Sequence, residues 1–253
     1  MNKIIAIANQ KGGVGKTTTA VNLAASLSAT KRRVLLIDLD PQGNATTATG
    51  ISEKNPKTLY DHYFNNTKII NCIYKTNDNY SAIAGGEELI ALEVAIRNDN
   101  KQGFLSSSLE ELEDVFDYTI IDTPPTLNQL TVEGLSSASG TLIPLQCEYY
   151  SLEGVTGLME TIKTLSDKNL SSNRVLGIVR TMVDMRNNLA KEVSDELEKH
   201  FSNLLFNTLI PRNVKLAEAP SHGVSGIKYM PNSYGAKAYL ALAGELIRKV
   251  EYV

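Results

Sequence analysis

The chain has 253 residues, of which 42% are hydrophobic and 21% charged, with a formal net charge of -3. This size and balance fit one globular domain and exclude a disordered or fibrous chain on composition. The charge is uneven, because residues 174–253 carry 11 Lys and Arg against 8 Asp and Glu, which leaves nucleic-acid binding open without deciding it.

Short apolar runs alternate along the chain with longer segments of helical periodicity. The predicted strands cover residues 4–8, 34–37, 118–121, 141–145, 175–179 and 204–210. The predicted helices cover residues 16–29, 87–96, 105–115, 127–137, 151–168, 189–201 and 235–250. Residues 65–79 are polar and Asn-rich, which predicts a surface loop with a short strand after it. Continuously apolar strands suit burial on both faces, so we expect a single three-layer α/β/α domain over residues 1–253 with a mainly parallel, doubly wound sheet.

The turn between the first predicted strand and helix reads Lys11-Gly12-Gly13-Val14-Gly15-Lys16-Thr17-Thr18. Glycines there let backbone N–H groups converge on phosphate oxygens, and the helix N-terminus adds partial positive charge. Lys16 would then reach the β and γ phosphates, and Thr17 would bind the bridging Mg²⁺. The plain motif has a glycine where this chain has Gln10, and a second lysine, Lys11, begins the loop instead. The segment resembles the deviant Walker A group of P-loop NTPases.

Two later strand ends carry carboxylates. The second predicted strand leads into Asp38 and Asp40, and the third ends at Asp122. Ligands of open α/β sheets bind at the carboxyl edge, so these acids are expected beside the phosphate loop. Asp122 stands where a Walker B carboxylate holds Mg²⁺ through water. For Asp38 and Asp40, the alternative is that they only cap the loop that follows the strand.

The resemblance extends well beyond the phosphate loop. Residues 10–19, 38–46, 122–125, 144–154 and 210–223 look like the chromosomal ParA and Soj partition ATPases, whereas residues 51–116 match poorly. No helix-turn-helix extension precedes the loop, so the chain resembles the short members of that family. The resemblance implies an Mg-ATP-dependent ATPase that forms a homodimer on ATP and binds double-stranded DNA without sequence preference. A ParB-like activator would stimulate hydrolysis and release the DNA.

The same resemblance implies roles for individual residues at the nucleotide. Lys11 would cross the dimer interface to the partner's nucleotide, which supplies charge in trans. Asp40 would position or activate the attacking water, and Asp38 would support the Mg²⁺ shell. Pro211 and Asn213 match a late loop that contacts adenine, largely through backbone atoms.

For DNA, the resemblance points to scattered basic residues on the ATP-bound dimer. The matching positions are Arg186 and Lys215, and Lys215 replaces the arginine expected there. Taken one at a time, such basic residues are more often plain surface charges. Further basic candidates are Lys191, Lys228 and Lys237.

Rival functions remain open at this stage. A MinD-like ATPase would attach to membrane through a C-terminal amphipathic helix, but the apolar spacing at 239–250 suits a helix packed on the sheet. An electron carrier like the nitrogenase iron protein needs cysteines in glycine-rich contexts, which Cys72 and Cys147 lack. Their spacing also argues against a disulfide framework or a zinc site. A cargo other than the chromosome is a third possibility.

The compartment follows from what the sequence lacks. No apolar stretch approaches the roughly 20 residues that span a bilayer. The first predicted strand begins almost at Met1, which leaves no room for a leader peptide. We therefore expect a cytoplasmic, nucleoid-associated protein with no membrane partner.

Overall fold

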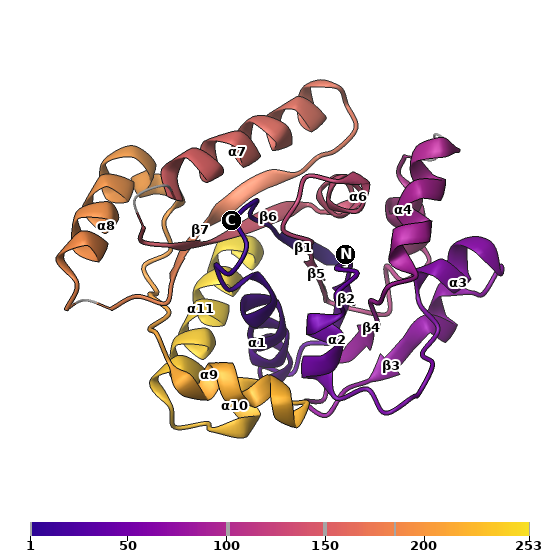
Figure 1. The fold of residues 1–253 in the computed structure, drawn as a ribbon, viewed down its shortest axis with the longest axis horizontal. Coiled ribbons are helices and arrows are strands. Elements are labelled where there is room, and N and C mark those ends of the chain that lie inside the picture. The colour runs from indigo at the N-terminus through magenta and orange to yellow at the C-terminus, as the bar shows by residue number, and fades with distance from the viewer. Residues whose placement is uncertain (1, 100–101, 149–150, 185, 253) are drawn as a thin grey trace.

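The computed structural model is built on a sheet of strand order β3-β4-β2-β5-β1-β6-β7 (Figure 1). It describes residues 2–99, 102–148, 151–184 and 186–252. All neighbouring strands in this order are parallel except β3 and β4, which pair antiparallel. The strands are β1 Lys3–Ile7, β2 Val34–Asp38, β3 Ile73–Lys75, β4 Ser81–Ile83, β5 Tyr118–Asp122, β6 Gly140–Gln146 and β7 Arg174–Thr181. The predicted doubly wound, mainly parallel sheet is confirmed.

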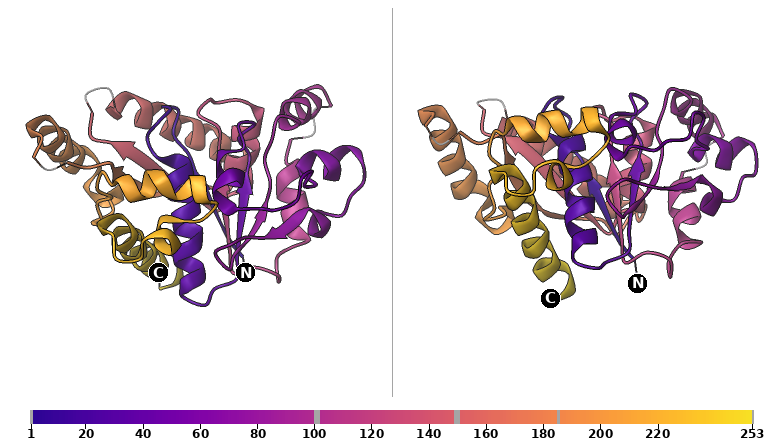
Figure 2. Two further views of the ribbon diagram at one scale, coloured as in Figure 1. Left: turned by 60° about the horizontal axis from the view of Figure 1, so that its bottom comes forward. Right: turned by 90° about the horizontal axis from the view of Figure 1, so that it is seen from below.

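Helices cover both faces of this sheet (Figures 1 and 2). They are α1 Lys16–Ala29, α2 Asn44–Thr49, α3 Leu59–Phe64, α4 Leu89–Asn98, α5 Phe104–Glu110, α6 Gln129–Ser137, α7 Ser151–Asp167, α8 Asn188–Phe201, α9 Val214–Glu218, α10 Gly226–Tyr229 and α11 Tyr234–Glu251. Short 3₁₀ helices lie at Ile69–Cys72, Ser202–Leu204 and Ala219–His222.

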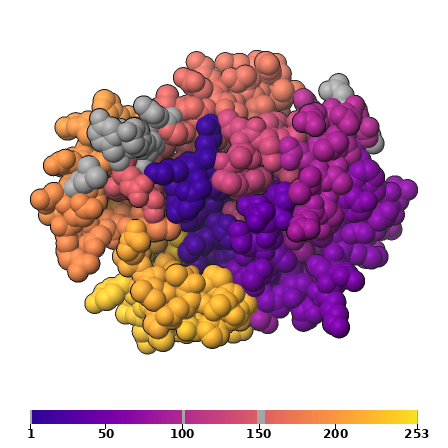
Figure 3. Space-filling model, viewed as in Figure 1, coloured from indigo at the N-terminus to yellow at the C-terminus, as the bar shows by residue number. Residues whose placement is uncertain are grey.

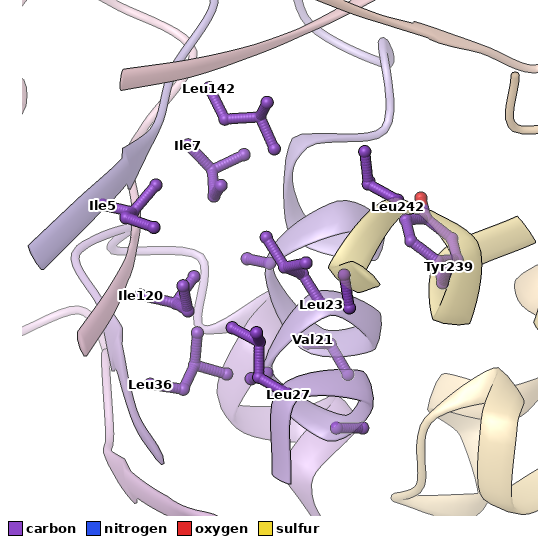
Figure 4. Close-up of a cluster of buried hydrophobic side chains, with 14 of the residues drawn as sticks. Ile5, Ile7, Val21, Leu23, Leu27, Leu36, Ile120, Leu142, Tyr239 and Leu242 are labelled. Carbon is purple, nitrogen blue, oxygen red and sulfur yellow. The ribbon is translucent and has the colours of Figure 1, made fainter. Parts of the chain in front are cut away.

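Successive strand residues face different helical layers, as a pleated strand requires. Ile5 of β1 and Leu36 of β2 face α1 and lie in one buried cluster with residues of α1 and α11 (Figure 4). Their chain neighbours point the other way: Ala6 joins a cluster with α7 and α8, and Leu35 joins a cluster with α4 and α5. Burial on both sides explains why the strands read as continuous apolar runs, and it confirms the three-layer α/β/α domain.

The last helix, α11, packs on α1 (Figures 2 and 4). Tyr239, Leu242 and Leu246 of α11 are fully buried, and the Tyr239 hydroxyl lies 3.1 Å from Oγ1 of Thr19. The apolar face predicted at the C-terminus is therefore part of the core. Among the residues that the structure describes, we find no helix with the length and apolar character of a membrane span.

The predicted strand at 204–210 is wrong. Residues 202–204 form a 3₁₀ helix, and beyond them Leu205 forms an isolated bridge with Ile178 of β7, while the N–H groups of Phe206 and Ile210 donate to β7. A second isolated bridge joins Pro211 to Val183, after the end of β7. The backbone N–H groups of Asn207 and Thr208 donate instead to the carboxylate of Glu245, at 2.7 and 3.1 Å. A side chain of α11 thus takes the Thr208 N–H, the next donor that a continuous ladder with β7 would use after Phe206.

Two other predictions need smaller corrections. The helix expected over 105–115 ends at Glu110 and continues as turns, because several acidic residues follow each other at the negative end of the helix dipole. The loop expected over 65–79 contains a 3₁₀ helix and the short edge strand β3, while the strand expected after it is confirmed as β4. The short helices α2, α3, α9 and α10 were not predicted, since helices of one or two turns carry little periodicity.

Candidate nucleotide site

The carboxyl ends of β1, β2 and β5 meet at one edge of the sheet. Asp122 of β5 pairs in register with Ile7 of β1 on one side and with Asp38 of β2 on the other. The loop that leaves β1 is the glycine-rich segment, so the structure brings the predicted acids and the predicted phosphate loop together. In Figure 3 the indigo N-terminal segment reaches the surface near the middle of the face shown, between yellow C-terminal residues and purple residues of the first half of the chain.

The glycine-rich loop is tied by hydrogen bonds to the two distant strands β6 and β7. The side-chain amide of Asn9 donates to Pro144 O (2.8 Å), and its oxygen accepts from the Lys11 N–H (2.9 Å). Thr181 of β7 donates its hydroxyl to Val14 O (2.7 Å). Gly15 has a φ of 87° and caps the N-terminus of α1, a left-handed conformation that side chains disfavour. The first N–H groups of α1 therefore face a rigid, preformed turn.

Lys16, the first residue of α1, extends its side chain into the site. It is only 7% exposed, and its ammonium donates to Lys11 O at 3.2 Å. Burial lowers the pKa of Lys16, and the nearby carboxylates of Asp122 and Asp40 partly oppose that shift. A desolvated cation with one weak neutral partner suits an anionic ligand.

Two adjoining cavities flank this loop. The first measures about 490 Å³; it is lined by Gly12, Gly13, Gly15, Lys16, Thr17, Thr18, Asp40, Gln42, Asn44, Thr47, Pro125, Met182 and Pro220. The second measures about 260 Å³; it is lined by Gly15, Thr18, Thr181, Met182, Ile210, Pro211, Arg212, Asn213, Val214, Leu216, Ala217 and Tyr239. Gly15, Thr18 and Met182 line both cavities, so the cavity around the glycine-rich loop adjoins a second, more apolar cavity. Pro211 and Asn213 line the second cavity.

Asp122 is the last residue of β5, and its carboxylate has an unusual environment. It is fully buried, and within the described part of the chain neither carboxylate oxygen has a hydrogen-bond partner. Desolvation raises the pKa of Asp122 well above its ordinary range, and the Asp38 carboxylate adds to the shift while the Lys16 ammonium opposes it. Unsatisfied buried carboxylate oxygens are expensive to keep, and a hydrated Mg²⁺ is a group that fits them.

Asp38 and Asp40 are held differently from Asp122. Asp38 accepts from the Asp40 N–H at 3.1 Å and from the Thr46 N–H and hydroxyl, both at 2.8 Å. Burial nevertheless raises the pKa of Asp38. Asp40 accepts from the Gln42 N–H at 3.0 Å and lines the larger cavity. Asp38 therefore organises the loop that carries Asp40.

The described residues contain no group of three or more His, Cys, Asp or Glu able to hold a metal alone. A cation at this edge would therefore share its coordination with water, with the Thr17 hydroxyl and with oxygens of a ligand. That division is typical of Mg²⁺ bound with a nucleotide, which keeps several waters and takes few protein ligands.

Comparison with known proteins identifies the family. A family model described as an AAA domain matches residues 2–178. The sporulation initiation inhibitor protein Soj of Bacillus subtilis is 44% identical over 250 residues, covering 97% of this chain and 98% of Soj. The chromosome partitioning protein ParA of Myxococcus xanthus is 43% identical over 252 residues, covering 98% of this chain and 89% of that protein. This chain belongs to the Soj and ParA family of chromosome-partitioning ATPases. It is an ATPase with the fold of that family.

A solved structure supports the fold of this family. Cobyrinic acid a,c-diamide synthase from Mycobacterium smegmatis, solved with a bound ATP analog and magnesium, superposes with a TM-score of 0.85 at 29% identity. The match covers 99% of this chain and 96% of that one.

Lys11, which the family resemblance singles out, lies at the rim of the site. Its ammonium contacts Glu148 at 2.6 Å, and the two side chains are 38% and 51% exposed. Tyr149 and Tyr150, which follow Glu148 in the segment that resembles ParA and Soj proteins, lie outside the described residues.

The two basic residues matched to DNA contacts are both paired with nearby acids. Arg186 is 91% exposed and donates to both carboxylate oxygens of Asp184, at 2.9 and 2.7 Å. Lys215 contacts Glu218 at 2.8 Å and lies over the ring of Tyr229. The guanidinium of Arg186 lowers the pKa of Asp184 to about 2, so this acid stays charged near neutral pH.

Sequence reasoning missed several residues of the site. Met182 lines both cavities with a φ of 51°, and no motif marks it. Thr46 and Glu148 fall inside segments that resemble the family, so their residue types could have been noticed. The two cysteines lie in separate clusters, and burial raises the pKa of the Cys72 thiol to about 11, as expected of an unreactive side chain.

Proposed function

We propose that this ATPase dimerises on Mg-ATP, binds double-stranded DNA without sequence preference and leaves it after hydrolysis stimulated by a ParB-like partner. The protein would act in the cytoplasm, associated with the nucleoid, and would segregate a chromosome or plasmid. The proposal combines membership in the Soj and ParA family with the arrangement of charged groups at the site.

Each residue of the site has a role in this proposal. The loop amides from Gly12 to Thr18 and the Lys16 ammonium bind the phosphates. Thr17 and Asp122 hold Mg²⁺, with Asp38 supporting its shell, and Asp40 orients or activates the attacking water. Pro211 and Asn213 border the adenine. The bound Mg²⁺ supplies charge neutralisation on the phosphates.

The position of Lys11 carries the proposal of a dimer. Gly12 and Lys16 line the larger cavity, whereas the Lys11 side chain points to Glu148 at the exposed rim. A lysine placed outside its own nucleotide cavity can reach the nucleotide of a second copy that docks on this face. It would then stabilise charge on the transferred phosphate in trans.

DNA binding would follow from the closed dimer. Arg186 and Lys215 on two subunits would contact backbone phosphates, which carry no sequence information. Such binding weakens steeply as salt rises because it releases counterions. Full binding that persists at high salt would contradict this part of the proposal.

One experiment tests the whole cycle. Duplex DNA binding is measured with ATP, ADP and no nucleotide, for the wild type and for Lys16→Ala, Asp40→Ala and Arg186→Ala. We expect ATP-dependent binding by the wild type, kept or enhanced in Asp40→Ala, and lost in Lys16→Ala and Arg186→Ala. Nucleotide-independent binding, or a wild type that stays monomeric with a non-hydrolysable ATP analog, would overturn the proposal. Co-sedimentation with liposomes in the presence of ATP would instead favour a MinD-like positioning ATPase.

A further inference from the structure

Gly85 lies in the turn after β4, within the stretch of residues 51–116 that carries no family motif. We infer that Gly85, acting through the Thr46 hydroxyl, positions the Asp38–Asp40 segment for hydrolysis. The two are positioning residues, since neither is proposed to touch the nucleotide. The inference deepens the proposed function and rests on the role proposed for Asp40.

A chain of hydrogen bonds joins Gly85 to Asp40. The Gly85 N–H donates to the Thr46 hydroxyl at 2.8 Å, and that hydroxyl donates to Oδ2 of Asp38 at 2.8 Å. Oδ1 of Asp38 accepts from the Asp40 N–H at 3.1 Å. Thr46 is therefore both acceptor and donor in one relay, which requires a hydroxyl group at this position.

The backbone around Gly85 also leaves no room for a side chain. A Cβ atom at Gly85 would lie 2.8 Å from Cγ of Asp38, 2.8 Å from its carbonyl oxygen and 2.9 Å from the carbonyl oxygen of Asp40. These are contacts that real Cβ atoms do not make, and two of the three are to backbone. The Gly43 backbone on the same loop approaches as well, since a Cβ there would lie 3.3 Å from Gly85 O.

The segment held in this way contributes directly to the nucleotide cavity. Asp40, Gln42, Asn44 and Thr47 all line it. The glycine-rich loop is anchored separately, through Asn9 to Pro144 and through Thr181 to Val14. Disturbing Gly85 or Thr46 should therefore displace the acidic side of the site and leave the phosphate-binding side in place. Hydrolysis should suffer more than nucleotide affinity.

Two matched pairs of variants test this inference. Gly85→Ala is compared with Gly86→Ala, where the three atoms nearest to an added Cβ all belong to the flexible carboxylate end of Glu88. Thr46→Val, which removes the hydroxyl, is compared with Thr46→Ser, which keeps it. Steady-state ATP hydrolysis, affinity for a fluorescent ATP analog and thermal melting are measured for all four proteins.

We expect Gly85→Ala and Thr46→Val to lower kcat by about 10- to 100-fold, the usual effect of misplacing a catalytic group by about 1 Å. Nucleotide affinity should stay within about threefold of wild type, a change in binding free energy less than half of that for a tenfold change in Kd. Gly86→Ala and Thr46→Ser should retain most of the activity. A wild-type kcat in Gly85→Ala would overturn the inference. So would a variant whose nucleotide affinity falls by as large a factor as its kcat and whose melting temperature falls as well, because that pattern means general unfolding.

Amide hydrogen exchange separates this inference from the proposed function. Without nucleotide, Gly85→Ala and Thr46→Val should exchange faster over residues 40–47 than the wild type, and Gly86→Ala should not. Unchanged exchange would contradict the positioning role whatever the kinetics show. Wild-type hydrolysis by Asp40→Ala would contradict the proposed role of Asp40. The exchange result would still show whether Gly85 and Thr46 hold the Asp38–Asp40 segment in place.

Discussion

The Lys11 ammonium lies 2.6 Å from the Glu148 carboxylate, although 137 positions separate the two residues. Both side chains are partly exposed, so the ion pair stabilises this arrangement by at most about 1 kcal/mol. In the proposed dimer Lys11 leaves Glu148 for the partner's nucleotide. The pair is therefore a weak restraint, and removing it should favour dimerisation.

Glu148→Gln should lower the ATP concentration at half-maximal dimerisation by up to about fivefold, the equivalent of about 1 kcal/mol. Sedimentation velocity across an ATP titration measures this in an Asp40→Ala background, in which hydrolysis is expected to be slow. Glu196→Gln, which removes the exposed Glu196–Lys199 pair on α8, is the matched control. A Glu148→Gln protein that dimerises no better than this control would contradict the restraint.

Asp122→Asn should keep or raise the stability of the unliganded protein and should weaken its stabilisation by Mg²⁺. Without ligand, the variant should be at least as stable as the wild type, because the wild-type carboxylate is fully buried and lacks a hydrogen-bond partner among the described residues. A ligand at 100-fold its Kd stabilises a protein by about 2.7 kcal/mol, and the Mg²⁺-dependent part of this gain should be lost. Thermal melting with ATP, with and without Mg²⁺, measures both effects. If Mg²⁺ still raised the melting temperature of the variant strongly in the presence of ATP, Asp122 would not be a ligand of the proposed metal site.

Glu218→Gln should strengthen DNA binding, because it frees the Lys215 ammonium from a competing carboxylate 2.8 Å away. The slope of log affinity against log salt concentration should become steeper by about one, which corresponds to the release of about one more counterion. Fluorescence anisotropy with duplex DNA and ATP, repeated at several salt concentrations, measures the slope. Asp114→Asn makes the same change in net charge at the opposite edge of the sheet and serves as the control. Equal gains in both variants would mean that net charge alone is responsible.

Glu251→Gln should destabilise the fold in a pH-dependent manner. The Glu251 carboxylate accepts two hydrogen bonds from Arg32, at 2.9 and 2.8 Å, and one from the Tyr118 hydroxyl at 2.6 Å. The Arg32 contact, followed by that of Tyr118, lowers the pKa of Glu251 from 4.5 to about 2. A depressed pKa adds stability above about pH 4.5 that is lost as the pH falls towards 2.

Urea denaturation at neutral pH should therefore show Glu251→Gln to be about 1 to 2 kcal/mol less stable than the wild type. The difference should shrink as the pH falls below 4.5. Glu113→Gln, at an exposed position, should show neither effect. A constant difference at all pH values would mean that the loss comes from packing and not from the charge.

The phosphate loop could be predicted because its requirements are local. A strand, a run of glycines with left-handed backbone at Gly13 and Gly15, and a helix that begins at Lys16 are all neighbours in the chain. The acids were predictable for a similar reason. Parallel strands place their carboxyl ends at one edge, so a carboxylate at the end of β5 must lie near the loop that leaves β1.

Contacts between segments that are distant in the chain could not be predicted in this way. The sequence suggests a strand at 204–210, but Glu245 of α11 takes two of its backbone donors. Residues 51–116 carry no motif, yet Gly85 from this stretch packs directly against Asp38 and Asp40. In both cases the deciding partner is remote in the chain, and only packing brings it close.

The sequence alone therefore determined the class of fold, the family and the meeting of the glycine-rich loop with the strand-end acids at one edge of the sheet, since these depend on local backbone conformation and on the direction of parallel strands. The tertiary structure decided how the charged groups are paired: Lys11 with Glu148, Arg186 with Asp184, and Asp38 with Thr46. Each pairing depends on where side chains point after packing, and residue spacing does not specify that direction.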